Sequence, residues 1–86
     1  MNRDLFNNVD LGDASRATMA LVDVAQDMDA HVAQVAAAAL FLLLTEHNHI
    51  TAQDAFAVTS NVMNHAQGRR PEFEAIAWFL REEFPK

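Results

Sequence analysis

The chain has 86 residues, the size of one small domain, and a domain of this size buries only about 60% of its unfolded surface. It contains no cysteine, which excludes a disulfide framework and thiolate chemistry and leaves oligomerisation as the expected reinforcement. Its formal net charge is -6 and its basic cluster is the pair Arg69 and Arg70, so direct nucleic-acid binding is disfavoured. The first residues lack the apolar run of a secretory signal, and we expect a cytoplasmic protein.

Residues 1–12 mix apolar side chains with Asn and Asp. The order is too irregular for a helix and too apolar for a free tail, so we expect an irregular N-terminal arm that folds back onto the core. Asp10 and Asp13 can each accept hydrogen bonds from the free amides of a first helical turn. We therefore expect a helix to begin between these two residues.

Apolar residues recur at alternating spacings of four and three from Leu21 to Leu42, which is a heptad pattern. No Gly or Pro interrupts this region, so we predict one long central helix over residues 14–46, about 50 Å in length. The alternative is a break near residues 27–29, where Asp29 would cap a second helix. In that case the first part folds back as a fourth helix and a monomeric bundle closes.

Residues 36–44 contain no polar side chain. A helix formed by them is apolar on every side, so it must be enclosed by other elements or by lipid. The apolar run begins at Val32, is interrupted by Gln34 and stops at Thr45, which is short of the ~20 residues needed to cross a bilayer. We therefore predict a buried core helix and no membrane association.

The second predicted helix covers residues 52–67. Thr51 and Asp54 have the spacing of a capping box, in which the Thr hydroxyl accepts from the third amide of the helix. Gly68 is placed to take the left-handed conformation that commonly ends a helix. No sequence pattern here indicates a strand.

The third predicted helix covers residues 71–84. Pro71 suits a first helical position, the acidic side chains that follow it suit the helix dipole, and Pro85 ends the helix. The predicted fold class is therefore all-α. A single helical domain over residues 1–86 forms a small bundle with one long central helix and two shorter C-terminal helices.

Two aromatic side chains of the third helix cannot both be buried. Trp78 projects about 140° from the centre of the apolar stripe and Phe79 about 120° the other way. Glu74, Arg81 and Glu82 occupy the helical positions around Trp78. Trp78 either lies over a loop or the N-terminal arm, or it anchors an interface, because Trp and Arg are over-represented at interface hot spots.

Two groups of residues could hold a metal ion by type alone. They are Glu46, His47 and His49 in one predicted turn, and Asp23, Asp27 and His31 along the long helix. Neither group has a metal-binding motif, and a polar turn and an Asp27–His31 side-chain pair explain the same spacing. The Ser and Thr residues lack base partners at motif spacing. We therefore assign no catalytic, cofactor-binding or metal-binding residue, and we expect no cofactor and no enzyme.

These observations favour a small acidic protein–protein interaction module, an adaptor or regulatory protein that forms a homodimer and binds a further protein. The two short helices cannot cover the whole long helix, and a second copy docked antiparallel would cover the apolar strip left bare. The predicted interface residues are Leu21, Val24, Ala25, Met28, Glu74, Trp78, Phe79, Arg81 and Glu82. The alternatives are an acidic inhibitor that presents carboxylates where an enzyme or a nucleic-acid-binding complex expects phosphate, and a metal-dependent enzyme.

Overall fold

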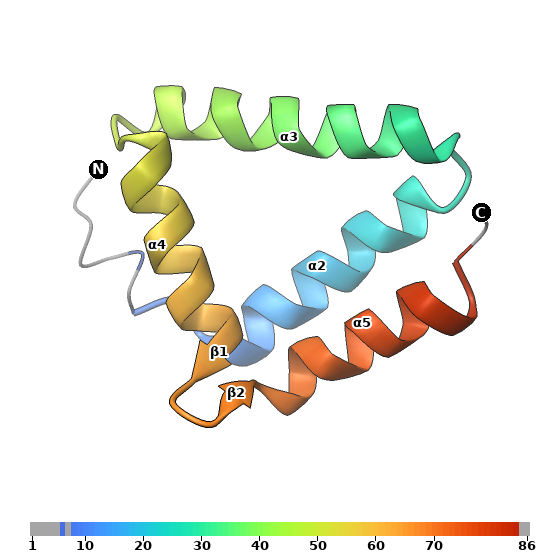
Figure 1. The fold of residues 1–86 in the computed structure, drawn as a ribbon. Coiled ribbons are helices and arrows are strands. Elements are labelled where there is room, and N and C mark those ends of the chain that lie inside the picture. Colours follow the sequence, from blue (N-terminus) through green and yellow to red (C-terminus); the bar gives the residue numbers. More distant parts are fainter. Residues whose placement is uncertain (1–5, 7, 85–86) are drawn as a thin grey trace.

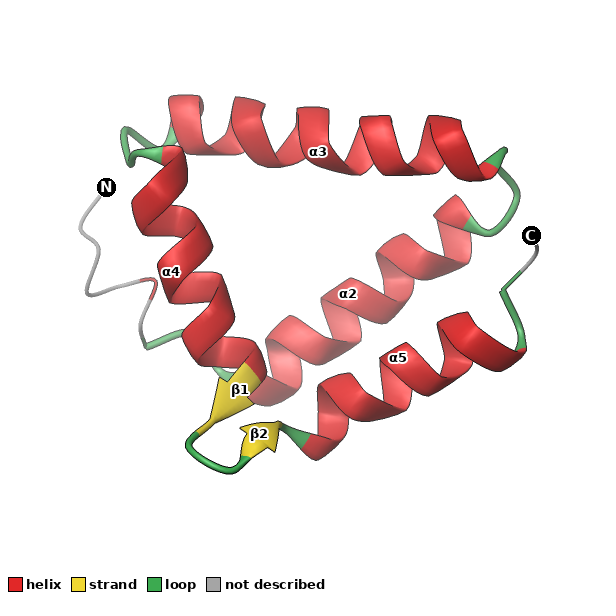
Figure 2. Ribbon diagram, viewed as in Figure 1, coloured by secondary structure: helices red, strands yellow, loops and turns green. Residues whose placement is uncertain are grey.

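The computed structural model describes residue 6 and residues 8–84, so residues 1–5 and 7 of the expected arm over residues 1–12 lie outside the described part. Four helices pack as a small bundle and a short hairpin joins the last two (Figure 1). The elements are α2 (Leu11–Ala25), α3 (Ala30–His47), α4 (Ala52–Met63), β1 (Asn64–His65), β2 (Gly68–Arg69) and α5 (Pro71–Glu82). Figure 2 shows a triangle in which α3 is one side, α4 is the second, and α2 and α5 together form the third. The predicted all-α bundle is confirmed.

The predicted long central helix is wrong, because the chain breaks between α2 and α3. The helix α2 begins between the two predicted caps, where the Asp10 carboxylate accepts from the Asp13 amide at 2.9 Å. It ends at Ala25, and α3 begins at Ala30. The Asp29 carboxylate accepts from the His31 amide at 3.2 Å and so provides the N-cap of α3. The alternative break near residues 27–29 is therefore confirmed.

The predicted start of the second helix is confirmed and its predicted end is wrong. The Thr51 hydroxyl accepts from the Asp54 amide at 3.0 Å, and α4 starts at the next residue after Thr51. The helix stops at Met63 instead of residue 67. Asn64 adopts an extended backbone and its side-chain amide donates to the Ser60 carbonyl at 2.9 Å, which satisfies a carbonyl of the last turn. The chain then enters β1.

The strands β1 and β2 form a two-stranded antiparallel hairpin that the sequence did not indicate. Asn64 pairs with Arg69, and His65 pairs with Gly68. Gly68 has φ +125, a backbone conformation that favours glycine, so it serves the hairpin and does not end α4. The helix α5 starts at Pro71 as predicted and ends at Glu82, two residues before the predicted end.

The hydrophobic core lies between α2 and α5. Val22 of α2 packs with Phe73 and Ile76 of α5, and partly buried side chains surround these three. The partly buried residues are Leu11, Ala14, Met19, Val62, Met63, Phe79 and Phe84. In α4, Ala55 and Val58 are buried as well.

The predicted burial of α3 is wrong for the isolated chain. The one buried side chain among the described residues of α3 is Thr45, at 8% exposure. The helix α2 folds back from the break but packs on α5, while α3 contacts α4. The four helices form the bundle expected for a broken helix, but within residues 8–84 α3 packs on α4 and leaves most of its apolar side chains exposed.

Candidate functional site

The strongest candidate site is an apolar groove between α2 and α3, with a volume of about 420 Å³. Ten side chains line it and all of them are hydrophobic. They are Leu21, Val24, Ala25, Met28, Ala33, Ala36, Ala37, Leu40, Phe41 and Leu44. We call this surface the α2/α3 groove. It can bind a complementary apolar surface, but it has no side chain that could carry out acid–base or nucleophilic chemistry.

The helix α2 and the turn after it supply four of the groove residues. These four are Leu21, Val24, Ala25 and Met28, the same residues that the sequence predicted for an interface. Val24 is the most exposed of them, at 61%. The structure therefore brings the four together on one accessible surface.

The helix α3 supplies the other six groove residues, which the sequence analysis assigned to a buried core. Three of them are alanines that form shallow positions, and three are large side chains. The signal for these residues was present in the sequence, because an all-apolar helix requires cover. The sequence predicted an uncovered strip on Leu21, Val24, Ala25 and Met28, but it did not show that α3 itself is left exposed.

The charged side chains of α2 lie on a different face from the groove. Arg16 and Asp23 line a separate hollow between α2 and α5, and Asp13 pairs with Arg16 at 2.6 Å. Successive residues of a helix turn by about 100°, so Asp23 points roughly 130° away from the groove face centred between Leu21 and Val24. An apolar partner could therefore enter the groove without burying a charge of α2.

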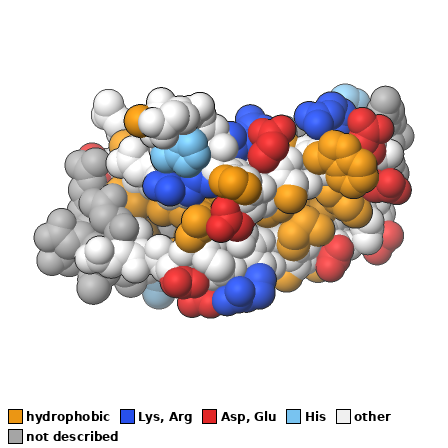
Figure 3. Space-filling view, turned by 90° about the horizontal axis from the view of Figure 1, so that it is seen from below, with side chains coloured by type: hydrophobic (Ala, Val, Ile, Leu, Met, Phe, Trp, Pro, Cys, Tyr) orange, Lys and Arg blue, Asp and Glu red, His pale blue; other side chains and the backbone are white. Residues whose placement is uncertain are grey.

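The second predicted surface, around Trp78, is mixed in character. Trp78 is 51% exposed and lines the hollow between α2 and α5, whereas Phe79 is partly buried and packs against the core cluster. The charged neighbours form surface ion pairs, Glu74 with Arg69 at 3.4 Å and Arg81 with Glu82 at 3.9 Å. Figure 3, seen from the side of α5, shows hydrophobic side chains interspersed with acidic and basic ones. The composition of this surface is therefore that of the polar rim of an interface and not of its apolar centre.

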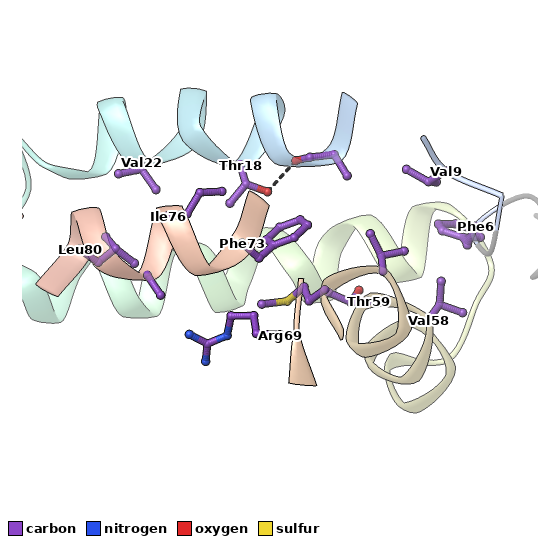
Figure 4. Close-up of a pocket in the computed structure, with 14 residues that line it drawn as sticks. Phe6, Val9, Thr18, Val22, Val58, Thr59, Arg69, Phe73, Ile76 and Leu80 are labelled. Carbon is purple, nitrogen blue, oxygen red and sulfur yellow. Dashed lines mark hydrogen bonds between the residues drawn. The ribbon is translucent and has the colours of Figure 1, made fainter. Parts of the chain in front are cut away.

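A further cavity of about 540 Å³ lies among α2, α4 and α5 (Figure 4). Its two hydroxyl groups are engaged, because Thr18 donates to the Ala14 carbonyl and Thr59 donates to the Ala55 carbonyl, each at 2.7 Å. Arg69 is the charged residue among the described lining. Small-molecule sites combine an apolar wall with several convergent polar groups. This cavity has the apolar wall but few polar groups that point into it.

The two groups of residues that could hold a metal ion by type are not brought together as ligands of one ion. Within residue 6 and residues 8–84, no three His, Asp or Glu side chains are close enough to hold one ion. His65 has a local role instead, since its Nδ1 atom accepts from the Gln67 amide at 3.0 Å inside the hairpin turn.

By length and composition alone, α3 could cross a membrane. Its 18 residues have a mean hydropathy of 1.3, and 6% of them are buried. One such helix is weak evidence, because signal sequences and the core helices of soluble proteins meet the same criteria, although core helices are mostly buried and α3 is not. The helix also carries Gln34, Glu46 and two histidines.

Comparison with known proteins gives no match, neither to a protein-family model nor to a curated protein or a solved structure. A functional assignment for this chain therefore has to come from the chemistry of its surfaces, and the α2/α3 groove is the most distinctive of them.

Proposed function

We propose that this protein is a small protein–protein interaction module, an adaptor or regulatory protein, and that the α2/α3 groove is its docking surface. The observation that supports the proposal is the groove itself, ten hydrophobic side chains with no charged one among them. Contiguous exposed apolar patches are rare on soluble monomers and mark interaction sites. Covering such a patch removes apolar surface from water, which is the main favourable term in association.

A helix or helical surface is the ligand that best suits this groove. Amphipathic helices dock into apolar grooves through side chains at helical spacing, and small residues in the floor allow the helix to approach closely. Ala33, Ala36 and Ala37 provide such a floor. A polar small molecule would find no hydrogen-bonding side chain there.

The charged surface around Trp78 has a supporting role in this proposal. Exposed ion pairs contribute little to stability, so Arg81 and Glu82 remain free to exchange partners. Trp78 beside them is a suitable anchor at the edge of a contact. The net charge of -6 would then influence the rate and selectivity of encounter more than the affinity.

Affinity capture from the cells that produce the protein tests this proposal, with two variants as a matched pair. Leu40 lies in the groove and is 44% exposed, whereas Leu42 is 54% exposed and is absent from the groove lining. The two side chains project about 160° apart on α3. Leu40→Asp should lose the captured protein and Leu42→Asp should retain it. Capture that survives Leu40→Asp would contradict the proposal.

The salt dependence of the captured complex provides a second test. A contact through the groove should persist at high salt, because apolar contacts are not screened. An acidic inhibitor that presents carboxylates to a basic site would instead lose its target steeply as salt increases. A complex that dissociates at high salt and survives Leu40→Asp would favour that alternative.

A further inference from the structure

We propose that the occupant of the α2/α3 groove is a second copy of this chain, with the two α3 helices antiparallel and crossing at their midpoints. The inference rests on the proposed function, since it names the partner of the same groove. Three observations support it: the exposed area of the chain, the order of small and large residues along α3, and the length of the apolar run.

The isolated chain exposes too much surface for its mass. Its accessible surface is 6321 Å² for 9.6 kDa, whereas a compact monomer of this mass exposes about 5,100 Å². The excess of about 1,200 Å² exceeds the ~800 Å² that each partner buries in a standard interface. The radius of gyration is 13.5 Å, against about 12 Å expected for this length. One homodimeric contact of standard size would cover about two thirds of this excess.

The six groove residues of α3 are self-complementary about the centre of the helix. The midpoint of Ala30–His47 lies between Ala38 and Ala39. A two-fold axis at that point places every groove alanine opposite a large side chain of the second copy. The facing pairs are Ala33 with Leu44, Ala36 with Phe41, and Ala37 with Leu40. Facing layers interdigitate when large residues meet small ones, and a two-fold interface requires this reciprocity.

A parallel pairing of the same helices would not pack in this way. Each residue would face its own copy, so Leu44 would meet Leu44 at one end and Ala33 would meet Ala33 at the other. The first contact would be crowded and the second would leave a gap. Antiparallel pairing also places the positive end of each helix dipole beside the negative end of the other. Leu21, Val24 and Met28 of each copy then flank the paired helices.

The length of the apolar run within α3 favours a protein occupant over a lipid one. The apolar run over residues 32–44 spans about 20 Å in a helix, which is short of the ~30 Å hydrocarbon core of a bilayer. Gln34 interrupts the run, and Glu46 follows it. A second helix of equal length matches this run along the groove face, while Val35 and Leu42 lie on the opposite face.

Disulfide trapping is a direct test, because the natural chain has no cysteine. Ala33→Cys and Leu44→Cys chains, mixed and oxidised, should form a mixed disulfide dimer. Neither variant should link to itself, because antiparallel pairing separates two copies of either residue by about 16 Å along the axis. Val35→Cys mixed with Leu42→Cys is the matched control on the opposite face of α3 and should not link. Self-linkage of Ala33→Cys, or linkage of the control pair, would overturn the proposal.

Steric exchange supplies a second test that does not depend on oxidation. Ala37→Leu should weaken the dimer at least about tenfold by overpacking the pair with Leu40. The double variant Ala37→Leu/Leu40→Ala restores one large and one small residue in each pair and should recover dimerisation. Light scattering of the natural chain at micromolar concentration should give about twice 9.6 kDa. Failure of the double variant to recover, or a mass of 9.6 kDa for the natural chain, would overturn the proposal.

Two outcomes separate this inference from the proposed function. A chain that stays at 9.6 kDa but captures a protein that Leu40→Asp loses would overturn the homodimer and leave the interaction module standing. If the mixed disulfide dimer forms but Leu40→Asp still captures the same other proteins, the homodimer is supported and the groove is not the docking site for those proteins. Flotation of the chain with phosphatidylcholine and phosphatidylglycerol vesicles tests the lipid alternative. A chain that floats with the vesicles and forms no mixed disulfide in the trapping experiment would overturn the proposal.

Discussion

The carboxylate of Asp29 accepts a hydrogen bond from the backbone amide of His31 at 3.2 Å, and this contact starts α3 in the middle of an apolar pattern that continues across it. The turn before it is tight, because the Met28 amide donates to the Ala25 carbonyl at 3.0 Å. This local cap converts one expected helix into two. It also decides which apolar residues face each other across the groove.

Asp29→Ala should lower the free energy of unfolding by about 1 kcal/mol, because it removes the N-cap of α3. Urea unfolding followed by circular dichroism at one fixed protein concentration measures the change. Asp27→Ala is the control, since it removes a carboxylate of the same turn that does not occupy the cap position. Equal effects of the two substitutions would show that charge, and not the cap, is responsible.

Thr51→Ala should also cost about 1 kcal/mol, through loss of the hydroxyl that accepts from the Asp54 amide at 3.0 Å. Thr51→Ser keeps the hydroxyl and should lose much less. The same urea titration compares the three proteins. A Ser variant as unstable as the Ala variant would show that the methyl group of Thr51 matters more than its hydrogen bond.

Ile76→Asp should abolish the helical circular dichroism signal, because Ile76 is 7% exposed and packs with Val22 and Phe73. Burying an unpaired carboxylate costs several kcal/mol, a large part of the ~5–15 kcal/mol stability of a typical domain. Leu42→Asp, on an exposed position of α3, should keep the signal. Loss of helicity in Leu42→Asp would restore the original prediction that this helix is buried.

Gly68→Ala should destabilise the protein by about 1 to 2 kcal/mol, although a Cβ atom there would meet no heavy atom within 4 Å. The cost comes from φ +125, which side-chain-bearing residues rarely adopt. Gln67→Ala at the neighbouring position is the control and should change stability little. Thermal unfolding resolves the difference, and an unchanged Gly68→Ala midpoint would contradict the strained hairpin geometry.

Trp78 is the one tryptophan of the chain, so its fluorescence reports on its own surroundings. At 51% exposure its emission should be that of a solvated indole, and acrylamide should quench it efficiently. Leu40→Asp should leave both properties unchanged, because the α2/α3 groove does not include Trp78. Blue-shifted, protected emission in the natural chain would place Trp78 inside a contact.

The sequence by itself determined the helical elements, because their signals are local. The cap at Thr51 and the start at Pro71 each depend on side chains within one turn of the helix end, and both are found where the pattern predicted them. Asp10 was one of two candidate caps, and α2 begins at Leu11, before the predicted start at residue 14. The break at Asp29 was one of two alternatives, because a heptad pattern of apolar residues continues across it. A helix N-cap at Asp29 and a continuous heptad pattern favour different structures there, and the structure has the N-cap.

The tertiary structure alone decided which apolar surfaces are covered. Val22 and Leu21 are adjacent in α2, yet Val22 is buried against α5 while Leu21 lines the open groove. The hydrophobic effect is not directional, so an apolar residue requires cover without specifying which element provides it. Packing α2 on α5 leaves most of the apolar side chains of α3 exposed among the described residues, and only the tertiary structure shows which of them these are.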